Sequence, residues 1–274
     1  MDETLSPRAA GARRLQDKVS IITGAGQGIG AATARRFGQE GATVVVADIS
    51  DKGAARTRQE LESHGVPTNG FVGDLSDWDT CHQLMDDTVH RYGRIDVLVN
   101  NVGGTIRNQE FWNYTQEQID QEMQRSFWPT MYCMRAALPH MVAAGSGSIV
   151  NLGSTAVHGI HRVPYAAAKG GVMALTTSVA QEVAAMGIRI NCVAPHATAI
   201  VDRIVPRNTE QRSTEDQQTA QNRMARFIGE GPYAGIDYIP MKRWGAADEQ
   251  AAAIAFLASE DASFITGQVL WVGS

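Results

Sequence analysis

The stretch Lys18-Val-Ser-Ile-Ile-Thr-Gly-Ala-Gly-Gln-Gly-Ile-Gly30 decides the fold of this chain. Its first half is a short run rich in β-branched residues, which is typical of a buried strand. Its second half places glycines in a loop, and an amphipathic segment, 29–40, follows directly. The order strand, glycine loop, helix predicts the first unit of an α/β domain.

The same alternation repeats along the chain. Further strands are expected at 43–47, 70–72, 95–100, 148–152, 188–193 and 268–272, and helices at 53–64, 76–92, 115–138 and 165–186. Apolar strands joined by helical crossovers indicate a parallel sheet. We therefore expect an α/β fold: a single doubly wound, Rossmann-like domain over residues 17–274, with about seven parallel strands.

Composition limits the possible partners and compartments. The 24 basic and 29 acidic residues are dispersed and give a formal charge of -5, which argues against a nucleic-acid partner. Cys81, Cys133 and Cys192 are far apart and match no zinc or redox-dithiol spacing, so we expect buried thiols, no metal site and a cytoplasmic protein. The N-terminus carries early acidic residues and no apolar run of the length that a secretory signal or a membrane span needs, so we expect no membrane partner.

Two segments fall outside the α/β pattern. Residues 1–16 contain three arginines and are expected to form a mobile extension; a mitochondrial presequence is the alternative, which Asp2 and Glu3 oppose. Residues 196–244 combine three prolines with a long polar run. We interpret this second segment as a lid over a substrate, and a solvated insertion is the alternative.

The glycine loop has the spacing of a dinucleotide site. Gly24 lets the strand turn, Gly28 lets a pyrophosphate approach the backbone, and Gly30 allows close helix packing. Asp48 ends the second strand, where a carboxylate accepts hydrogen bonds from ribose hydroxyls and repels a 2'-phosphate. Since Gln27 occupies a loop position where an arginine would have met that phosphate, we predict NAD as the cofactor.

Other residues at the same sheet edge are expected to contact the cofactor. Asp74 follows the third strand and would bond the adenine amino group, whereas Asn100 and Gly103 would line the cofactor channel. Asn101 has two interpretations of equal weight, as a cofactor contact and as a structural cap. The full predicted set adds Ile29, Ile49, Leu75, Pro195 and Thr198.

A second motif, Tyr165-Ala-Ala-Ala-Lys169, predicts where a proton is transferred. Residues four positions apart lie on one face of a helix, so the ammonium of Lys169 lies beside the phenol of Tyr165 and favours its ionised form. Ser154 lies eleven residues upstream, at the end of an expected strand. Such a phenol is suited to act as an acid or base.

These motifs, together with Asn100-Asn-Val-Gly103, resemble those of the short-chain dehydrogenase/reductase family in order and spacing. The resemblance implies that Tyr165 exchanges the proton, Lys169 assists it and holds the nicotinamide ribose, and Ser154 binds the substrate oxygen. It also implies a homotetramer. One departure is Ser126, which stands where many relatives carry an asparagine of the proton relay. A second is His196 in Pro195-His-Ala-Thr198, where relatives usually have glycine.

Several strings are similar to a narrower group of that family, the dihydrodiol dehydrogenases that act on benzoate-type cis-diol carboxylates. They are Asn101-Val-Gly-Gly-Thr-Ile106, Leu138-Pro-His-Met141, Arg162-Val-Pro-Tyr-Ala-Ala-Ala-Lys-Gly-Gly171 and Pro206-Arg-Asn208. This similarity implies NAD-dependent oxidation of a 1,2-dihydroxycyclohexadiene carboxylate to a catechol or a dihydroxybenzoate. A carboxylated substrate requires a cation, and Arg107, Arg162 and Arg207 are the candidates by position.

Two other functions remain open at this point. A reductase of 3-oxoacyl thioesters, or a sugar or steroid alcohol dehydrogenase, would share the fold, and Asp48 opposes an NADPH-driven reductase. A cofactor-binding sensor without catalysis would share the glycine loop. The joint presence of Ser154, Tyr165 and Lys169 opposes the sensor.

Overall fold

A seven-stranded parallel sheet forms the centre of the molecule. The computed structural model describes residues 13–200, 204 and 239–273. The strands run in the order β3-β2-β1-β4-β5-β6-β9, and every neighbouring pair is parallel. Their bounds are β1 (Val19–Thr23), β2 (Thr43–Asp48), β3 (Thr68–Val72), β4 (Val97–Asn100), β5 (Gly147–Leu152), β6 (Ile188–Pro195) and β9 (Val269–Val272).

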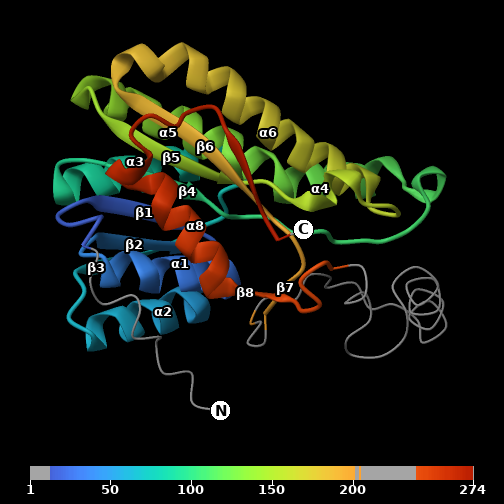
Figure 1. The fold of residues 1–274 in the computed structure, drawn as a ribbon, viewed down its shortest axis with the longest axis horizontal. Coiled ribbons are helices and arrows are strands. Elements are labelled where there is room, and N and C mark those ends of the chain that lie inside the picture. The colour runs from blue at the N-terminus through green and yellow to red at the C-terminus, as the bar shows by residue number, and fades with distance from the viewer. Residues whose placement is uncertain (1–12, 201–203, 205–238, 274) are drawn as a thin grey trace.

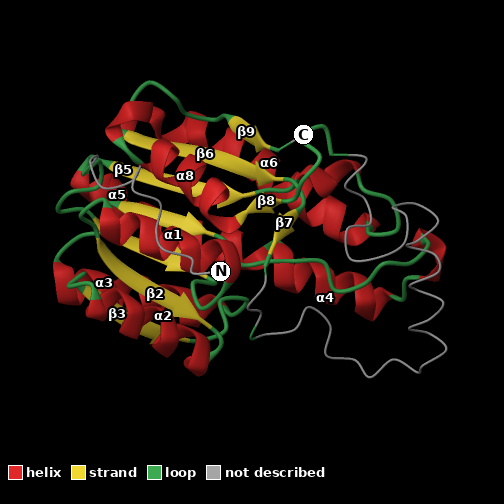
Figure 2. Cartoon of the chain, turned by 60° about the horizontal axis from the view of Figure 1, so that its bottom comes forward, coloured by secondary structure: helices red, strands yellow, loops and turns green. Residues whose placement is uncertain are grey.

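Helices cover both faces of this sheet (Figures 1 and 2). One face carries α1 (Gly28–Gln39), α2 (Asp51–Ser63) and α8 (Ala247–Ala258), and the other carries α3 (Trp78–Tyr92), α5 (Trp128–Ala144) and α6 (Val163–Val183). A further helix, α4 (Gln116–Ser126), packs on α5 and α6. The predicted doubly wound Rossmann-like fold is confirmed.

Alternate residues of each strand supply the two hydrophobic cores. In β2, Val44 and Val46 pack with Phe37 on the α1 face, whereas Val45 and Ala47 pack on the α3 face. This alternation follows from the pleat, which directs successive side chains to opposite faces. Because both faces are covered, central strands such as β2 are apolar at nearly every position.

The order reversal between β1 and β4 places a crevice at the carboxyl ends of the strands. From β1 the chain winds outward through β2 to β3, and then returns to β4 on the other side of β1. Ligands of open parallel sheets bind at such a reversal. The loops that carry the predicted site residues all start from this edge.

The structure corrects the predicted helix over 115–138, which is divided into α4 and α5 at Phe127. Pro129 lacks an N–H and cannot bond the carbonyl of Arg125 one turn earlier, so a continuous helix is interrupted here. The two helices therefore pack at different places, with α4 against the site-bearing loops and α5 against β4 and β5.

The predicted domain boundary at residue 17 is too late. Leu15 is fully buried in the core, and its backbone N–H donates to the Glu40 carbonyl. The guanidinium of Arg14 donates two hydrogen bonds to the buried Glu40 carboxylate, at 2.7 and 2.5 Å. Residues 13–16 therefore belong to the domain, and residues 1–12 of the predicted extension lie outside the described residues.

Most of the predicted lid, 196–244, also lies outside the described residues, but its two ends are placed side by side. Thr198–Ala199 (β7) pairs in parallel with Gly245–Ala246 (β8). Arg243 and Glu249 form an ion pair at 2.5 Å just beyond, which lowers the pKa of Glu249 to about 2. The segment thus leaves and re-enters the domain at one point.

Candidate active site

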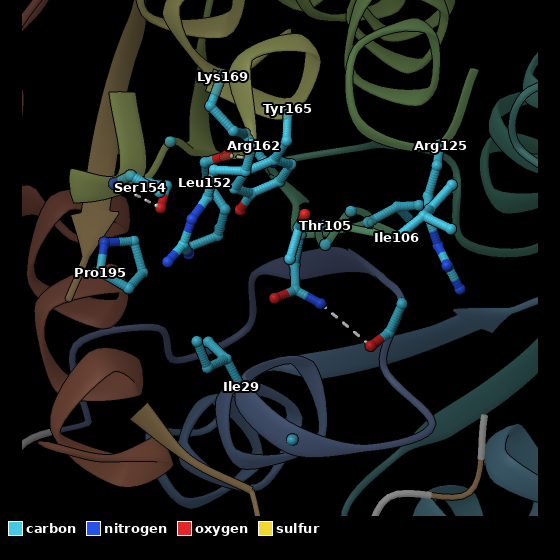
Figure 3. A pocket seen from close by; sticks show the side chains of 18 of the residues that line it. Ile29, Thr105, Ile106, Arg125, Leu152, Ser154, Arg162, Tyr165, Lys169 and Pro195 are labelled. Carbon is cyan, nitrogen blue, oxygen red and sulfur yellow. Dashed lines mark hydrogen bonds between the residues drawn. The ribbon is translucent and has the colours of Figure 1, made fainter. Parts of the chain in front are cut away.

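A cavity of about 1180 Å³ extends along the carboxyl edge of the sheet, from the glycine loop to the loop before α6 (Figure 3). Its lining contains most of the residues predicted from sequence: Gly24, Gln27, Gly28, Ile29, Asp48, Ile49, Asp74, Leu75, Asn101, Gly103, Arg107, Ser154, Arg162, Tyr165, Lys169, Pro195 and Thr198. These residues come from loops after six strands and are far apart in sequence. The fold therefore brings the predicted cofactor and catalytic groups to one site.

The glycine loop is closed by tight backbone contacts. Gly24 and Gly28 have φ of 61° and 56°, in the left-handed region that favours glycine. A Cβ on Gly30 would lie 2.1 Å from the Gly24 carbonyl oxygen, which confirms the close packing predicted there. Gly30 itself lies behind the cavity, where it brings α1 against the loop.

Asn101 caps this loop from the next strand. Its side-chain amide donates to the carbonyls of Thr23 and Gly24, each at 3.0 Å. The structural interpretation of Asn101 therefore holds, although the residue also lines the cavity. The expectation that Asn100 lines the cofactor channel is wrong, because its buried amide donates inward to Asn151 at 2.9 Å.

Asp48 is fixed at the end of β2. One carboxylate oxygen accepts from the Gly26 N–H and the other from the Ser50 N–H, both at 2.8 Å. Asp48 is buried but borders the cavity, so each oxygen keeps a lone pair for a further donor. Asp74, after β3, is similarly held, by the backbone and hydroxyl of Ser76.

Gln27 has a contact that the sequence did not indicate. Its side-chain oxygen accepts a hydrogen bond from the Ile204 N–H at 2.6 Å. Ile200 also reaches this loop, since a Cβ on Gly28 would lie 2.9 Å from its Cδ1. Ile200 and Ile204, near the start of the predicted lid, therefore lie against the glycine loop.

Tyr165 and Lys169 lie on the first turns of α6, and both border the cavity. The Lys169 ammonium donates to the Leu152 carbonyl at 2.7 Å, and its burial lowers its pKa to about 8. A Cβ on Gly103 would lie 2.8 Å from Nζ, so this glycine, at φ of 146°, makes room for the ammonium. Ser154 is the second residue of the loop that follows β5, and its Oγ accepts from the Ala156 N–H at 3.0 Å.

Comparison with known proteins agrees with this geometry. The family model described as short chain dehydrogenase matches residues 18–211. The chain belongs to the short-chain dehydrogenase family. The solved structure of levodione reductase superposes with a TM-score of 0.82 at 32% identity, covering 95% of this chain and 97% of that one.

Two curated relatives of this short-chain dehydrogenase carry names that state a substrate. The 1,6-dihydroxycyclohexa-2,4-diene-1-carboxylate dehydrogenase of Acinetobacter baylyi is 42% identical, over 95% of this chain and 97% of the relative. The 3-oxoacyl-[acyl-carrier-protein] reductase FabG of Thermotoga maritima is 36% identical, over 94% of this chain and 97% of the relative.

Short-chain dehydrogenases bind a nicotinamide cofactor, and the residues of this site fit one. The glycine loop presents backbone N–H groups at the start of α1, which suit a pyrophosphate. The Asp48 carboxylate suits ribose hydroxyls, and the Lys169 ammonium is available at the other end of the cavity. The part of the chain that the structure describes holds no group of three metal-binding side chains, and no helix within it is long and apolar enough to cross a membrane.

Ser126, at the relay position of this short-chain dehydrogenase, lies behind the cavity wall. It is the last residue of α4 and fully buried, and its Oγ accepts from the Gly104 N–H at 3.3 Å. A Cβ on Gly103 would lie 2.8 Å from the Lys169 Nζ and 3.5 Å from the Ser126 Oγ, so both groups lie on the same side of this glycine. Its predicted relay role stays a prediction.

The structure places two of the three predicted arginines. Arg162 occupies the N-cap position of α6, and its side chain points into the cavity close to Ser154 and Tyr165 (Figure 3). Arg107 also borders the cavity but is almost fully buried. Arg207 lies outside the described residues.

Sequence reasoning missed several groups at this end of the site. Arg125 and Gln121 of α4 border the cavity, and Glu122, fully buried between them, accepts from the backbone N–H groups of Ile106 and Arg107, each at 2.9 Å. Burial raises the pKa of Glu122. Its position one helical turn before Ser126 was the one available signal, because residues four apart share a face.

Proposed function

We propose that this protein uses NAD to oxidise a carboxylated cyclic cis-diol of the 1,2-dihydroxycyclohexadiene type. The proposal rests mainly on one observation: a single cavity is lined by Ser154, Tyr165 and Lys169 and also by Arg162, which lies at the N-terminus of α6. An arginine suits a carboxylate because its planar fork donates two parallel hydrogen bonds. The 42% identical relative named for such a substrate supports the same conclusion.

The choice of NAD rests on Asp48. Its two oxygens are held by the backbone N–H groups of Gly26 and Ser50, so the carboxylate cannot turn aside to admit a 2'-phosphate. A Cβ on Gly26 would lie 2.8 Å from the Asp48 carboxylate, so the glycine loop packs tightly against this side chain. A fixed negative charge at this point favours two ribose hydroxyls over a phosphate dianion.

The catalytic groups each have a defined task in this reaction. The Tyr165 phenolate takes the proton of the substrate hydroxyl, and the Lys169 ammonium lying on the same helix face stabilises that phenolate. Ser154 donates a hydrogen bond to the oxygen that becomes a carbonyl. The oxidising power would come from NAD held at this site, which would serve as the acceptor of the hydride from the carbon that carries this oxygen.

The pKa of Lys169 sets an upper limit to the pH at which its ammonium can assist Tyr165. Burial lowers it to about 8, so the ammonium is present at neutral pH and is lost as the pH rises through that value. Its hydrogen bond to the Leu152 carbonyl keeps it oriented while charged. The assistance given to Tyr165 therefore fades above about pH 8.

The equilibrium favours oxidation of the diol, because the ketone that forms is converted to an aromatic ring in the next step. Where the carboxylate is on the carbon next to the new ketone, the β-keto acid loses carbon dioxide and catechol results. Where it is elsewhere, enolisation gives a dihydroxybenzoate. The protein's part is the oxidation in both cases.

We also propose a cytoplasmic homotetramer with a lid formed by residues 196–244. The buried thiols of Cys81 and Cys133, 3.5 Å apart, support a reducing compartment. The half-exposed Trp271 of the edge strand β9 supports an interface at this edge. The pairing of β7 with β8, which holds the two ends of the segment together at the cavity, supports the lid.

A panel assay tests the function. Purified protein is given NAD or NADP with 1,6-dihydroxycyclohexa-2,4-diene-1-carboxylate, with its uncarboxylated cis-diol counterpart, and with a sugar alcohol and a hydroxysteroid; a 3-oxoacyl thioester is offered with NADH or NADPH. We expect fastest NADH formation with the carboxylated diol and one carbon dioxide released per NADH. Preferred turnover of the thioester or an alcohol would replace the proposal by the reductase or alcohol dehydrogenase, and turnover of none would favour the sensor.

A further inference from the structure

Two loops at the substrate end of the cavity are joined by hydrogen bonds. The loop before α4 spans residues 101–115 and the loop before α6 spans residues 153–162. The Gln109 N–H donates to the His161 carbonyl at 2.7 Å. The Tyr114 hydroxyl lies between the same loops, 2.9 Å from the Arg107 carbonyl oxygen and 3.3 Å from the His161 carbonyl oxygen, and its single proton is shared between these two acceptors. A buried tyrosine thus connects segments 47 residues apart.

The residue held by these bonds has an unusual backbone conformation. His161 has φ of 60°, in the left-handed region, which costs free energy for a residue other than glycine. Such a conformation persists where surrounding contacts impose it, and here Gln109 and Tyr114 hold the His161 carbonyl. The imposed turn sets the direction in which the chain enters α6.

Arg162 is the next residue, so the turn at His161 aims its side chain. It is the N-cap of α6, and Pro164 fixes the first helical turn behind it. A Cβ on Gly159 would lie 3.1 Å from the Arg162 Nε and 3.2 Å from its Cδ, so this glycine leaves room for the arginine. The side chain reaches the cavity beside Ser154 and Tyr165 (Figure 3).

Two further arginines that border this end of the cavity, Arg107 and Arg125, lie near a buried carboxylate. Arg107 and Arg125 both lie close enough to the buried Glu122 to oppose the rise of its pKa. Arg107 is 2% exposed, and its backbone N–H and carbonyl are occupied by Glu122 and Tyr114. These contacts suit a residue that supports the wall of the cavity.

We propose that Arg162 binds the substrate carboxylate and that Tyr114 is the positioning residue that aims it, by holding the His161 turn. This inference rests on the proposed function and assigns the part of the site that recognises the acid group. It predicts that Tyr114 affects carboxylate recognition only through Arg162. The reacting hydroxyl, at Ser154 and Tyr165, is recognised separately.

A double-mutant cycle tests the coupling. The variants are Arg162→Met, Tyr114→Phe and both together, with Arg91→Met and Tyr92→Phe on α3 as matched controls. For each, kcat and KM are measured with NAD for the carboxylated diol and for its uncarboxylated counterpart. The readout is the ratio of the two kcat/KM values, which a general loss of folding or catalysis does not change.

Arg162→Met is expected to lower this ratio about fiftyfold, mainly through KM for the acid, because a charge-assisted pair is lost. Tyr114→Phe is expected to lower it about fivefold, since one hydrogen bond is removed while the ring stays. In the Arg162→Met background, Tyr114→Phe is expected to change the ratio no further. The controls should keep the wild-type ratio.

Three outcomes would overturn the inference, and they separate it from the proposed function. An unchanged ratio in Arg162→Met, with wild type still preferring the acid, would refute Arg162 alone, and loss of the ratio in Arg107→Met would then assign the carboxylate to Arg107. Additive effects in the double variant would refute the positioning role of Tyr114. A wild type that oxidises neither diol would refute the proposed function and the inference together.

Discussion

The cofactor end and the substrate end of the cavity are built in different ways. At the cofactor end, Gly24, Gly28 and Gly30 lie within seven consecutive residues, in the loop after β1 and the start of α1, and the end of β2 adds Asp48. At the substrate end, Arg162 depends on hydrogen bonds that Gln109 and Tyr114 make from a separate loop. The cofactor end is therefore determined mainly by residues close together in the sequence, and the substrate end by contacts between residues far apart in the sequence.

This difference explains how a family can keep one cofactor site and vary its substrates. Backbone N–H groups and glycines leave little room for substitution, since a Cβ on Gly30 would lie only 2.1 Å from the Gly24 carbonyl oxygen. Loops joined by a few side-chain bonds can change one contact at a time. The proposed catalytic residues Tyr165 and Lys169 lie where the two ends meet, on the first turns of α6.

The largest expected effect is at that meeting point. Tyr165→Phe removes the hydroxyl of the proposed base and should lower kcat by about a thousandfold for both diols, because general acid-base catalysis contributes on that scale. NAD affinity, measured by fluorescence titration, should change less than about threefold, about the effect of one neutral hydrogen bond. If more than a tenth of the wild-type kcat remained, Tyr165 would not be the base.

A change at the cofactor end should affect NAD alone. Gly30→Ala forces a Cβ against the Gly24 carbonyl and should weaken NAD binding about a hundredfold, as displaced phosphate contacts are lost. Gly170→Ala on α6 is the matched control, since a Cβ there has open space. Calorimetric titration of NAD measures both, and equal affinities in the two variants would contradict the tight closure of the loop.

Cofactor choice should depend on one carboxylate. Asp48→Ser removes the charge near the adenosine ribose and should lower kcat/KM for NAD about thirtyfold while raising it for NADP. Asp79→Asn, on the exposed first turn of α3, is the control. The two cofactors are compared in steady-state assays with one diol, and an unchanged NAD preference in Asp48→Ser would refute the role of Asp48.

The smallest effect on activity is expected from substitution of Glu122, whose carboxylate holds the loop at the substrate end of the cavity. Glu122→Gln keeps an oxygen that can accept from Ile106 and Arg107, and relieves the burial of a carboxylate whose pKa is raised. We expect the Gln variant to keep its melting temperature, and Glu122→Ala to lose about fivefold in kcat/KM together with several degrees of Tm. Equal behaviour of the two variants would show that the hydrogen bonds are not what matters.

The sequence predicted the parts of the molecule that short-range patterns determine. The strand, glycine loop and helix around residues 18–40, and the four-residue spacing of Tyr165 and Lys169, occupy their predicted places. What it missed depends on long-range contacts. Leu15 packs into the core through contacts that its own segment does not show, and the break at Phe127 separates α4 from α5.

Within the site, the missed residues are those whose role depends on a partner. Nothing around Tyr114 in the chain indicates that its hydroxyl meets a carbonyl 47 residues later. Asn100 was placed in the channel because it ends a strand, but the pleat turns its side chain inward toward Asn151. The helix α8 was also missed, although Asp248 and Glu249 followed by an alanine-rich run are typical of a helix start.

The most direct test of the whole account is a crystal structure of the protein with NAD and 2-hydroxybenzoate, an unreactive aromatic analogue of the carboxylated diol. The account predicts the adenosine ribose hydroxyls on Asp48, the ring hydroxyl between Ser154 and Tyr165, and the carboxylate paired with Arg162. A carboxylate bound to Arg107 or facing solvent, with the ring hydroxyl away from Tyr165, would contradict it.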